Sequence, residues 1–151
     1  MRTGDLAPDF TLPDERGESR TLSDFLGAGP VVLFFYPAAM TAGCTAESCH
    51  FRDLAKEFAE VGAQRAGISP DPVAKQREFA DTHGFDYPLL SDADGTVAKQ
   101  FGVRRSFGPL LTRRHTFVIG TDRRVLEVIK SELRMSVHAD KALAVLRARG
   151  A

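Results

Sequence analysis

The 151-residue sequence has little that would direct it to nucleic acid, to a membrane or out of the cell. Twenty Lys and Arg residues balance twenty Asp and Glu residues, so no net charge attracts nucleic acid, anionic lipid or an acidic partner. The longest apolar run, Val31 to Tyr36, is far too short to span a bilayer. Asp5, Pro8 and Asp9 interrupt the N-terminal stretch where a secretory signal needs continuous apolar residues. We therefore expect a cytoplasmic protein with no nucleic-acid and no membrane partner.

Repeats, low-complexity tracts and linker-like stretches are absent as well. Hydrophobic residues make up 43% of the chain and charged residues 26%, which are ordinary values for a soluble globular protein. The length is near the commonest size of one domain and is sufficient for a full hydrophobic core. These values predict a single domain over residues 1–151.

Cysteine is scarce, and the only two cysteines, Cys44 and Cys49, lie five positions apart. A domain of this size needs no disulfide between such near neighbours for its stability. In the reducing cytosol, a close cysteine pair is more often catalytic or metal-binding than structural. The pair is therefore the first candidate for a functional site.

Strand and helix patterns alternate along the chain. We predict a hairpin from residues 10–12 and 18–21, a short helix capped by Ser23 and ending near Gly27, strands at 31–36, 63–69, 87–90, 115–120 and 124–130, and helices at 45–61, 71–84, 92–101 and 139–147. The run 31–36 is apolar throughout, which is typical of a central strand covered on both faces. Alternation of this kind predicts one α/β domain built on a mixed central sheet.

Cys44 falls where the loop after the central strand enters the next predicted helix. Unpaired backbone N–H groups and the positive end of the helix dipole favour an anion there, so we expect the Cys44 thiolate, the reactive form, to be stabilised. Thr41 could offer a hydroxyl to a small polar ligand beside the sulfur, and Pro37 could shield the sulfur from bulk water. The spacing of these residues makes a pocket plausible.

The position of Cys49 carries mechanistic information. Five residues along a continuous α-helix separate the two Cα atoms by about 8.6 Å, whereas a disulfide needs Cα atoms within about 7 Å. If the cysteines join, the segment between them must unwind first. Alternatively, Cys49 is a small apolar residue on the buried face of the helix.

The segment from Phe35 to Cys49 resembles the active-site segment of the peroxiredoxins. Pro37, Thr41 and Cys44 match the Pro-x-x-x-Thr-x-x-Cys core of that family, and a second cysteine five places later is similar to the Q-type, or bacterioferritin-comigratory, subfamily. Residues 4–10 and 114–119 also resemble segments of the family. The resemblance implies a thioredoxin-like α/β fold with a mixed central sheet flanked by helices and an N-terminal β-hairpin.

The same resemblance implies a role for individual residues. Cys44 would be the peroxidatic nucleophile, Thr41 would hydrogen-bond the bound peroxide and Pro37 would cover the sulfur. Arg114, next to a second arginine at position 113, matches the family's active-site arginine, which would stabilise the thiolate and polarise the O–O bond. Glu47 would orient that arginine.

The implied activity is a thiol-dependent peroxidase that reduces hydrogen peroxide and organic hydroperoxides to water or alcohols. Attack by Cys44 leaves a sulfenic acid, Cys49 resolves it as an intramolecular disulfide, and an external dithiol reduces the disulfide by exchange. The resemblance implies a thioredoxin-like or glutaredoxin-like reductant, a monomer, and neither a cofactor nor a metal.

Other interpretations of the pair fit the sequence less well. Cys44, Cys49 and His50 could be imagined as metal ligands, but the spacing is not a usual one for zinc. A thioredoxin-like disulfide oxidoreductase would need Cys-x-x-Cys, and a binding domain with inert cysteines would leave the proline, threonine and arginine matches unexplained. We expect the four histidines on the surface or in packing, and we predict that the loop at 101–111 forms an apolar wall near the site.

Overall fold

A mixed β-sheet of five strands runs through the protein in the order β5-β4-β3-β6-β7. The computed structural model describes residues 1–105 and 112–150. The strands are β3 (Val31–Phe35), β4 (Gln64–Ser69), β5 (Leu89–Ser91), β6 (His115–Ile119) and β7 (Val125–Lys130). Strand β3 pairs in parallel with β4 and antiparallel with β6. The predicted mixed central sheet is therefore confirmed, with β3 at its centre.

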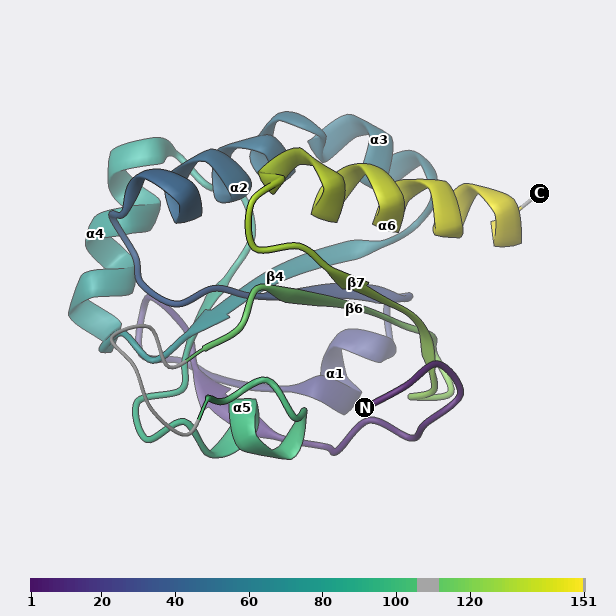
Figure 1. Cartoon of the computed structure of the whole chain (residues 1–151), viewed down its shortest axis with the longest axis horizontal. Coiled ribbons are helices and arrows are strands. Elements are labelled where there is room, and N and C mark those ends of the chain that lie inside the picture. The colour runs from purple at the N-terminus through teal and green to yellow at the C-terminus, as the bar shows by residue number, and fades with distance from the viewer. Residues whose placement is uncertain (106–111, 151) are drawn as a thin grey trace.

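Helices cover both faces of this sheet (Figure 1). One face carries α2 (Ala42–Asp53), α3 (Ala55–Glu60), α4 (Val73–His83) and α6 (Met135–Gly150); the other carries α1 (Leu22–Leu26), α5 (Thr96–Gln100) and a hairpin of β1 (Thr11–Pro13) and β2 (Ser19–Thr21). The hairpin strands are antiparallel, as predicted. No helix in the described parts of the chain is long and apolar enough to cross a membrane.

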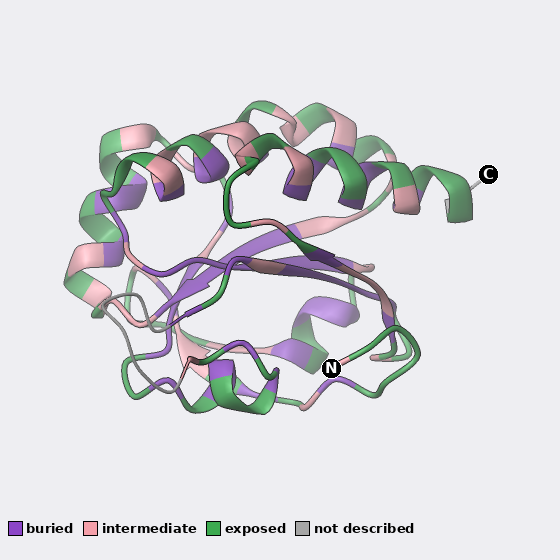
Figure 2. Cartoon of the chain, viewed as in Figure 1, coloured by how far each residue is buried: buried purple, intermediate pink, exposed green. Residues whose placement is uncertain are grey.

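Alternating residues of β3 and Tyr36, the residue that follows it, enter two separate hydrophobic clusters. Residues 31, 33 and 35 pack with α1 and α5, and residues 32, 34 and 36 pack with the helices of the other face. Every residue of the strand is buried, as its purple colour in Figure 2 shows. A strand that is paired on both edges and covered on both faces has no polar side, which explains its continuous apolar sequence.

The helix predicted over residues 45–61 is wrong in one respect, because two helices occupy this segment. Helix α2 ends at Asp53, Leu54 leaves the helical conformation with φ −97° and ψ 20°, and α3 starts at Ala55. Phe51 and Phe58 lie on either side of the break, both fully buried, with ring centroids 5.9 Å apart. The apolar spacing continues across the break, so periodicity alone could not reveal it.

The predicted cap of the first short helix is also wrong. The N-cap of α1 is Thr21, whose hydroxyl lies 2.8 Å from that of Thr11 in the hairpin. The backbone N–H of Ser23 donates instead to the Asp9 carboxylate at 3.0 Å. A residue distant in sequence therefore satisfies a free N–H of this helix start. The predicted end is confirmed, with Gly27 at the C-cap.

Candidate active site

Cys44 lies in the first turn of α2, directly after the loop that leaves β3. The helix begins at Ala42 with Thr41 at its N-cap, and its first backbone hydrogen bond runs from the Thr45 N–H to the Thr41 carbonyl at 2.9 Å. The N–H groups of the preceding residues have no carbonyl partner within the helix. The predicted position of Cys44 at a helix start is confirmed, and this position favours negative charge on the sulfur.

Arg114 contacts the cysteine directly. Its Nη2 donates to Cys44 Sγ at 3.1 Å, and both side chains are buried, at 8% and 0% exposure. The antiparallel pairing of β3 with β6 opposes Phe34 and Thr116, which brings the residue before β6 beside the end of β3. Arg113 is exposed. The structure therefore selects Arg114 from the two neighbouring arginines.

Gly43 makes this close approach possible. A Cβ atom at this position would lie 2.9 Å from Arg114 Nη2 and 3.5 Å from its Cζ, and the nearer of these distances is too short for an ordinary contact. Any larger residue at this position would force the guanidinium to shift away from its place against the start of α2. The sequence shows a glycine before the cysteine, but its role depends on an arginine 71 positions later and could not be predicted from the local segment.

Glu47 is one turn further along α2 and is fully buried beside the arginine. Its Oε1 lies 3.7 Å from Arg114 Nη1, and its Oε2 lies 3.4 Å from Nε2 of His138. Among the described residues, neither oxygen has a hydrogen-bond partner. Burial raises the pKa of Glu47 to about 8, the charge of Arg114 opposes this rise and that of Glu132 adds to it.

His138 of α6 completes the buried cluster. Its Nε2 lies 2.8 Å from the Ser131 carbonyl, and its Nδ1 lies 2.8 Å from the Thr116 hydroxyl. Because a carbonyl only accepts, Nε2 carries the hydrogen. Burial lowers the pKa of His138, and the positive charge of Arg114 lowers it further. The prediction of a packing residue holds, but its place beside Glu47 was missed because α6 begins four residues before its predicted start.

Thr41 and Pro37 lie in the loop between β3 and α2. The Thr41 side chain is exposed, and its hydroxyl donates to the Ala38 carbonyl at 2.7 Å. Its proton is therefore already used, and its oxygen is left to accept from a ligand. Pro37 is buried. Met40 has a positive φ of 68°, a conformation that costs a non-glycine residue free energy.

Cys49 lies in the same helix as Cys44. Both cysteines carry free thiols; Cys44 is buried and Cys49 is half-buried. Helix α2 is continuous from Ala42 to Asp53, which confirms that both residues belong to one helix. The hydroxyl of Tyr87 donates to the Ser48 carbonyl at 2.7 Å, immediately before Cys49.

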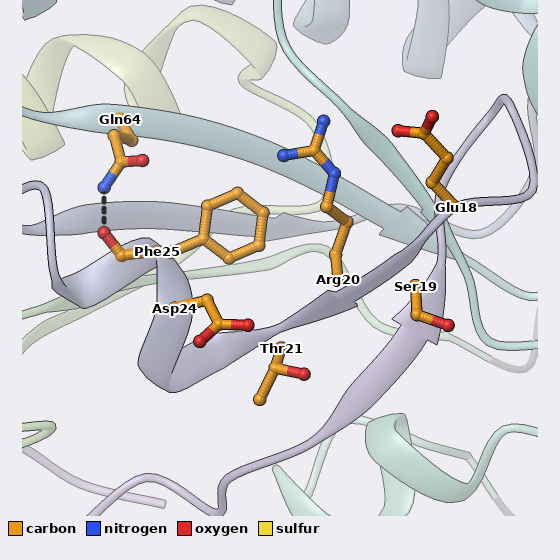
Figure 3. Close-up of a pocket in the computed structure, with 7 residues that line it drawn as sticks. All are labelled: Glu18, Ser19, Arg20, Thr21, Asp24, Phe25 and Gln64. Carbon is orange, nitrogen blue, oxygen red and sulfur yellow. Dashed lines mark hydrogen bonds between the residues drawn. The ribbon is translucent and has the colours of Figure 1, made fainter.

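A surface pocket of about 320 Å³ lies where β4 begins, away from Cys44 (Figure 3). It is lined by Glu18, Ser19, Arg20, Thr21, Asp24, Phe25 and Gln64. Gln64 begins β4, and its side-chain amide donates to the Phe25 carbonyl. The loop that leads to Cys44 instead follows the last residue of β3, which runs parallel to β4. Cys44 and Gln64 therefore lie at opposite ends of the sheet, and none of the predicted site residues lines this pocket.

Two further predictions concern the surroundings of the site. Phe101 packs in the core against Phe35 and Phe117, whereas residues 106–111 of the predicted apolar wall lie outside the described residues. No group of three or more His, Cys, Asp or Glu side chains in residues 1–105 and 112–150 is placed to hold a metal ion.

The site consists of a cysteine at a helix start, held against a buried arginine. The fold beneath it is a mixed sheet covered by helices. Together they are the arrangement of a thioredoxin-like thiol enzyme. Residues 3–128 match the model of the AhpC/TSA family. The crystal structure of peroxidoxin BcpB from Mycobacterium tuberculosis is 66% identical, with a TM-score of 0.94 over 98% of this chain and 97% of that one. Peroxiredoxin Q from Xanthomonas campestris is 31% identical, with a TM-score of 0.84 over 94% and 92%.

A plant relative is similar as well. The chloroplastic peroxiredoxin Q of Oryza sativa subsp. japonica is 37% identical over 144 residues, which cover 95% of this chain and 66% of that protein. The chain belongs to the AhpC/TSA family and is a peroxiredoxin. It is thus a thiol-dependent peroxidase, an oxidoreductase that reduces a peroxide with electrons from a thiol reductant.

Proposed function

We propose that Cys44 is the peroxidatic nucleophile of this peroxidase and that Cys49 resolves the oxidised form as an intramolecular disulfide. The observation that carries the proposal is the contact from Arg114 Nη2 to Cys44 Sγ at 3.1 Å in the first turn of α2. A cation and the free N–H groups of a helix start both favour the thiolate over the thiol. The thiolate is the form that attacks a peroxide.

The neighbouring side chains supply the other requirements of the reaction. Thr41 accepts a hydrogen bond from the peroxide O–H, since its own proton is bonded to the Ala38 carbonyl. Arg114 stabilises the thiolate and the charge that develops on the leaving oxygen. Glu47 orients the guanidinium through its contact at 3.7 Å. Pro37 covers the sulfur from bulk water.

The chemistry proceeds in two steps within the protein. The Cys44 thiolate attacks the terminal oxygen of a hydroperoxide, a new S–O bond forms, and the O–O bond breaks. The departing alkoxide or hydroxide takes a proton and leaves as alcohol or water. The Cys49 thiol then loses its proton and its sulfur attacks the Cys44 sulfur, so that an S–S bond replaces the S–O bond. The departing hydroxide takes up that proton and leaves as water. An external dithiol reduces the disulfide by exchange.

The second step requires local unfolding of α2. Within an ideal helix the two Cα atoms are about 8.6 Å apart, beyond the roughly 7 Å that a disulfide spans. The later part of the helix is tied to the sheet, because Arg65 Nη1 donates to the Phe51 carbonyl at 2.8 Å and the Phe51 ring stacks on Phe34 at 4.2 Å. The unwinding is therefore confined to the part of α2 before Phe51.

Peptide mapping tests this proposal. Reduced protein treated with one equivalent of hydrogen peroxide should yield a peptide pair linked between Cys44 and Cys49. A Cys49→Ser variant should still oxidise at the parental rate and accumulate sulfenic acid that a dimedone reagent traps, whereas Cys44→Ser should consume no peroxide. Peroxide consumption by Cys44→Ser at the parental rate would show that the nucleophile is another group. Normal turnover of Cys49→Ser would remove only the resolving role.

We also propose that residues 1–151 form one domain, that the protein acts as a monomer in the cytoplasm, and that its reductant is thioredoxin-like or glutaredoxin-like. Both hydrophobic clusters are built on the central strand β3, which supports one domain. Both thiols lie on α2 of one subunit, so the disulfide needs no second copy, which supports a monomer. Light scattering of the reduced and oxidised protein tests the monomer, and a dimer in both states would contradict it. Turnover with each reductant class separately identifies the electron donor.

A further inference from the structure

One peptide unit in the loop before α2 is held from both sides. The Ala38 carbonyl accepts the Thr41 hydroxyl at 2.7 Å, and the N–H of Ala39 in the same peptide unit donates to Asp71 Oδ2 at 2.6 Å. The orientation of this peptide plane therefore determines the direction of the Thr41 hydroxyl. Asp71 follows β4, so it reaches the loop from the neighbouring strand.

The Asp71 carboxylate is itself fixed by the protein core. Ser69 Oγ donates to the same Oδ2 atom at 2.7 Å and receives a hydrogen bond from Gln76 Nε2 at 2.8 Å. The Gln76 oxygen in turn accepts the Tyr36 hydroxyl at 2.5 Å. Gln76 and Tyr36 are fully buried. The chain of bonds thus connects the carboxylate to the end of β3, where the loop begins.

The loop needs such an external restraint. Between Ala39 and Thr41, Met40 adopts a φ of 68°, which is unfavourable for a residue with a side chain, and it is exposed at 37%. Its own packing therefore does little to hold the turn. A carboxylate acceptor gives a stronger hydrogen bond than a neutral one, and it polarises the Ala38–Ala39 peptide so that the carbonyl accepts more strongly.

We propose that Asp71 is a positioning residue for the peroxide step, acting through the Ala38–Ala39 peptide on the Thr41 hydroxyl. With its proton bonded to the Ala38 carbonyl, Thr41 presents an oxygen acceptor to the O–H of a hydroperoxide. Asp71 touches neither the substrate nor Cys44 in this scheme. The inference rests on the role of Thr41 in the proposed function.

A double-mutant cycle with Thr41→Val and Asp71→Ala tests this coupling in the full chain. We expect Asp71→Ala to slow the reaction of Cys44 with hydrogen peroxide about tenfold, the effect of losing one hydrogen bond to a charged group. In the Thr41→Val background the same substitution should have almost no further effect, because the group that it positions is gone. Alkylation of Cys44 by iodoacetamide, which does not use the Thr41 hydroxyl, should stay within about twofold of the parental rate in every variant.

The matched control is Asp92→Asn. Asp92 also holds a backbone through its carboxylate, accepting from the Val97 and Ala98 N–H groups at 3.1 and 2.9 Å. It precedes α5, however, and the backbone that it holds is the first turn of that helix. Its substitution should leave the peroxide rate unchanged. Asp71→Asn preserves the shape of the side chain and serves if Asp71→Ala does not fold. Its neutral oxygen should slow the reaction about threefold, again only when Thr41 is present.

Three outcomes would overturn the inference. Multiplicative slowing by the two substitutions would show that Asp71 acts independently of Thr41. Equal slowing of peroxide and iodoacetamide would show a general effect on Cys44. A parental peroxide rate for Thr41→Val would remove the Thr41 role itself, while the nucleophilic role of Cys44 is tested separately by Cys44→Ser.

Discussion

The buried carboxyl of Glu47 should make the stability of the folded protein depend on pH in a specific direction. In the unfolded chain this carboxyl loses its proton near its ordinary pKa of 4.5, whereas burial in the fold raises the pKa to about 8. Between these values the folded state binds one more proton than the unfolded state. The free energy of unfolding therefore falls as the pH rises through this range.

The magnitude follows from the two pKa values. A rise from 4.5 to about 8, at 1.36 kcal/mol per pH unit, corresponds to at most about 5 kcal/mol. The Glu47→Gln variant keeps the shape of the side chain and has no proton to lose. Its stability relative to the parent should therefore increase steadily from pH 4.5 to pH 8 and then become constant.

Urea unfolding of the reduced proteins at several pH values, followed by circular dichroism, measures this difference. Glu60→Gln, which removes an exposed carboxylate of α3, is the control for the loss of one negative charge. The effects of other titrating groups cancel in the difference between variant and parent, except those of groups coupled to Glu47: His138, which faces it at 3.4 Å, and Glu132, whose charge raises its pKa. Parallel stability curves for Glu47→Gln and the parent between pH 5 and pH 8 would refute the reasoning.

Three further predictions concern the same region. Gly43→Ala places a Cβ 2.9 Å from Arg114 Nη2 and should slow the reaction with peroxide about tenfold. The melting temperature should not fall, because alanine favours the helix. An unchanged reaction rate would contradict the steric account. Tyr87→Phe removes the hydrogen bond to the Ser48 carbonyl and should speed disulfide formation about fivefold, measured by acid quenching and mass spectrometry. Burial lowers the pKa of His115 to about 4. The free energy of unfolding of the parent should therefore fall relative to that of His115→Gln as the pH decreases from 6.5 to 4. Equal acid sensitivity of the two proteins would disprove this prediction.

The local sequence was sufficient to predict the central elements. The apolar run at 31–36 identified the buried strand because a strand covered on both faces has no polar positions. The two cysteines, together with Thr41 and Pro37, lie within one short segment, so the place of Cys44 at the helix start that follows this loop could be predicted from spacing. The break at Leu54 could not, because the apolar residues on its two sides keep the same periodicity.

The site itself depends on contacts between segments that are distant in the chain. Pairing of β3 with β6 brings Arg114, rather than its neighbour, to the Cys44 sulfur, and parallel pairing with β4 brings Asp71 to the loop of Thr41. Local spacing predicts which residues share an element, whereas strand order and register decide which side chains meet. The sequence by itself determined the place of Cys44, the proposed nucleophile, at a helix start. Only the tertiary structure decided what surrounds it, because burial and charge there are contributed by strands and a helix from other parts of the chain.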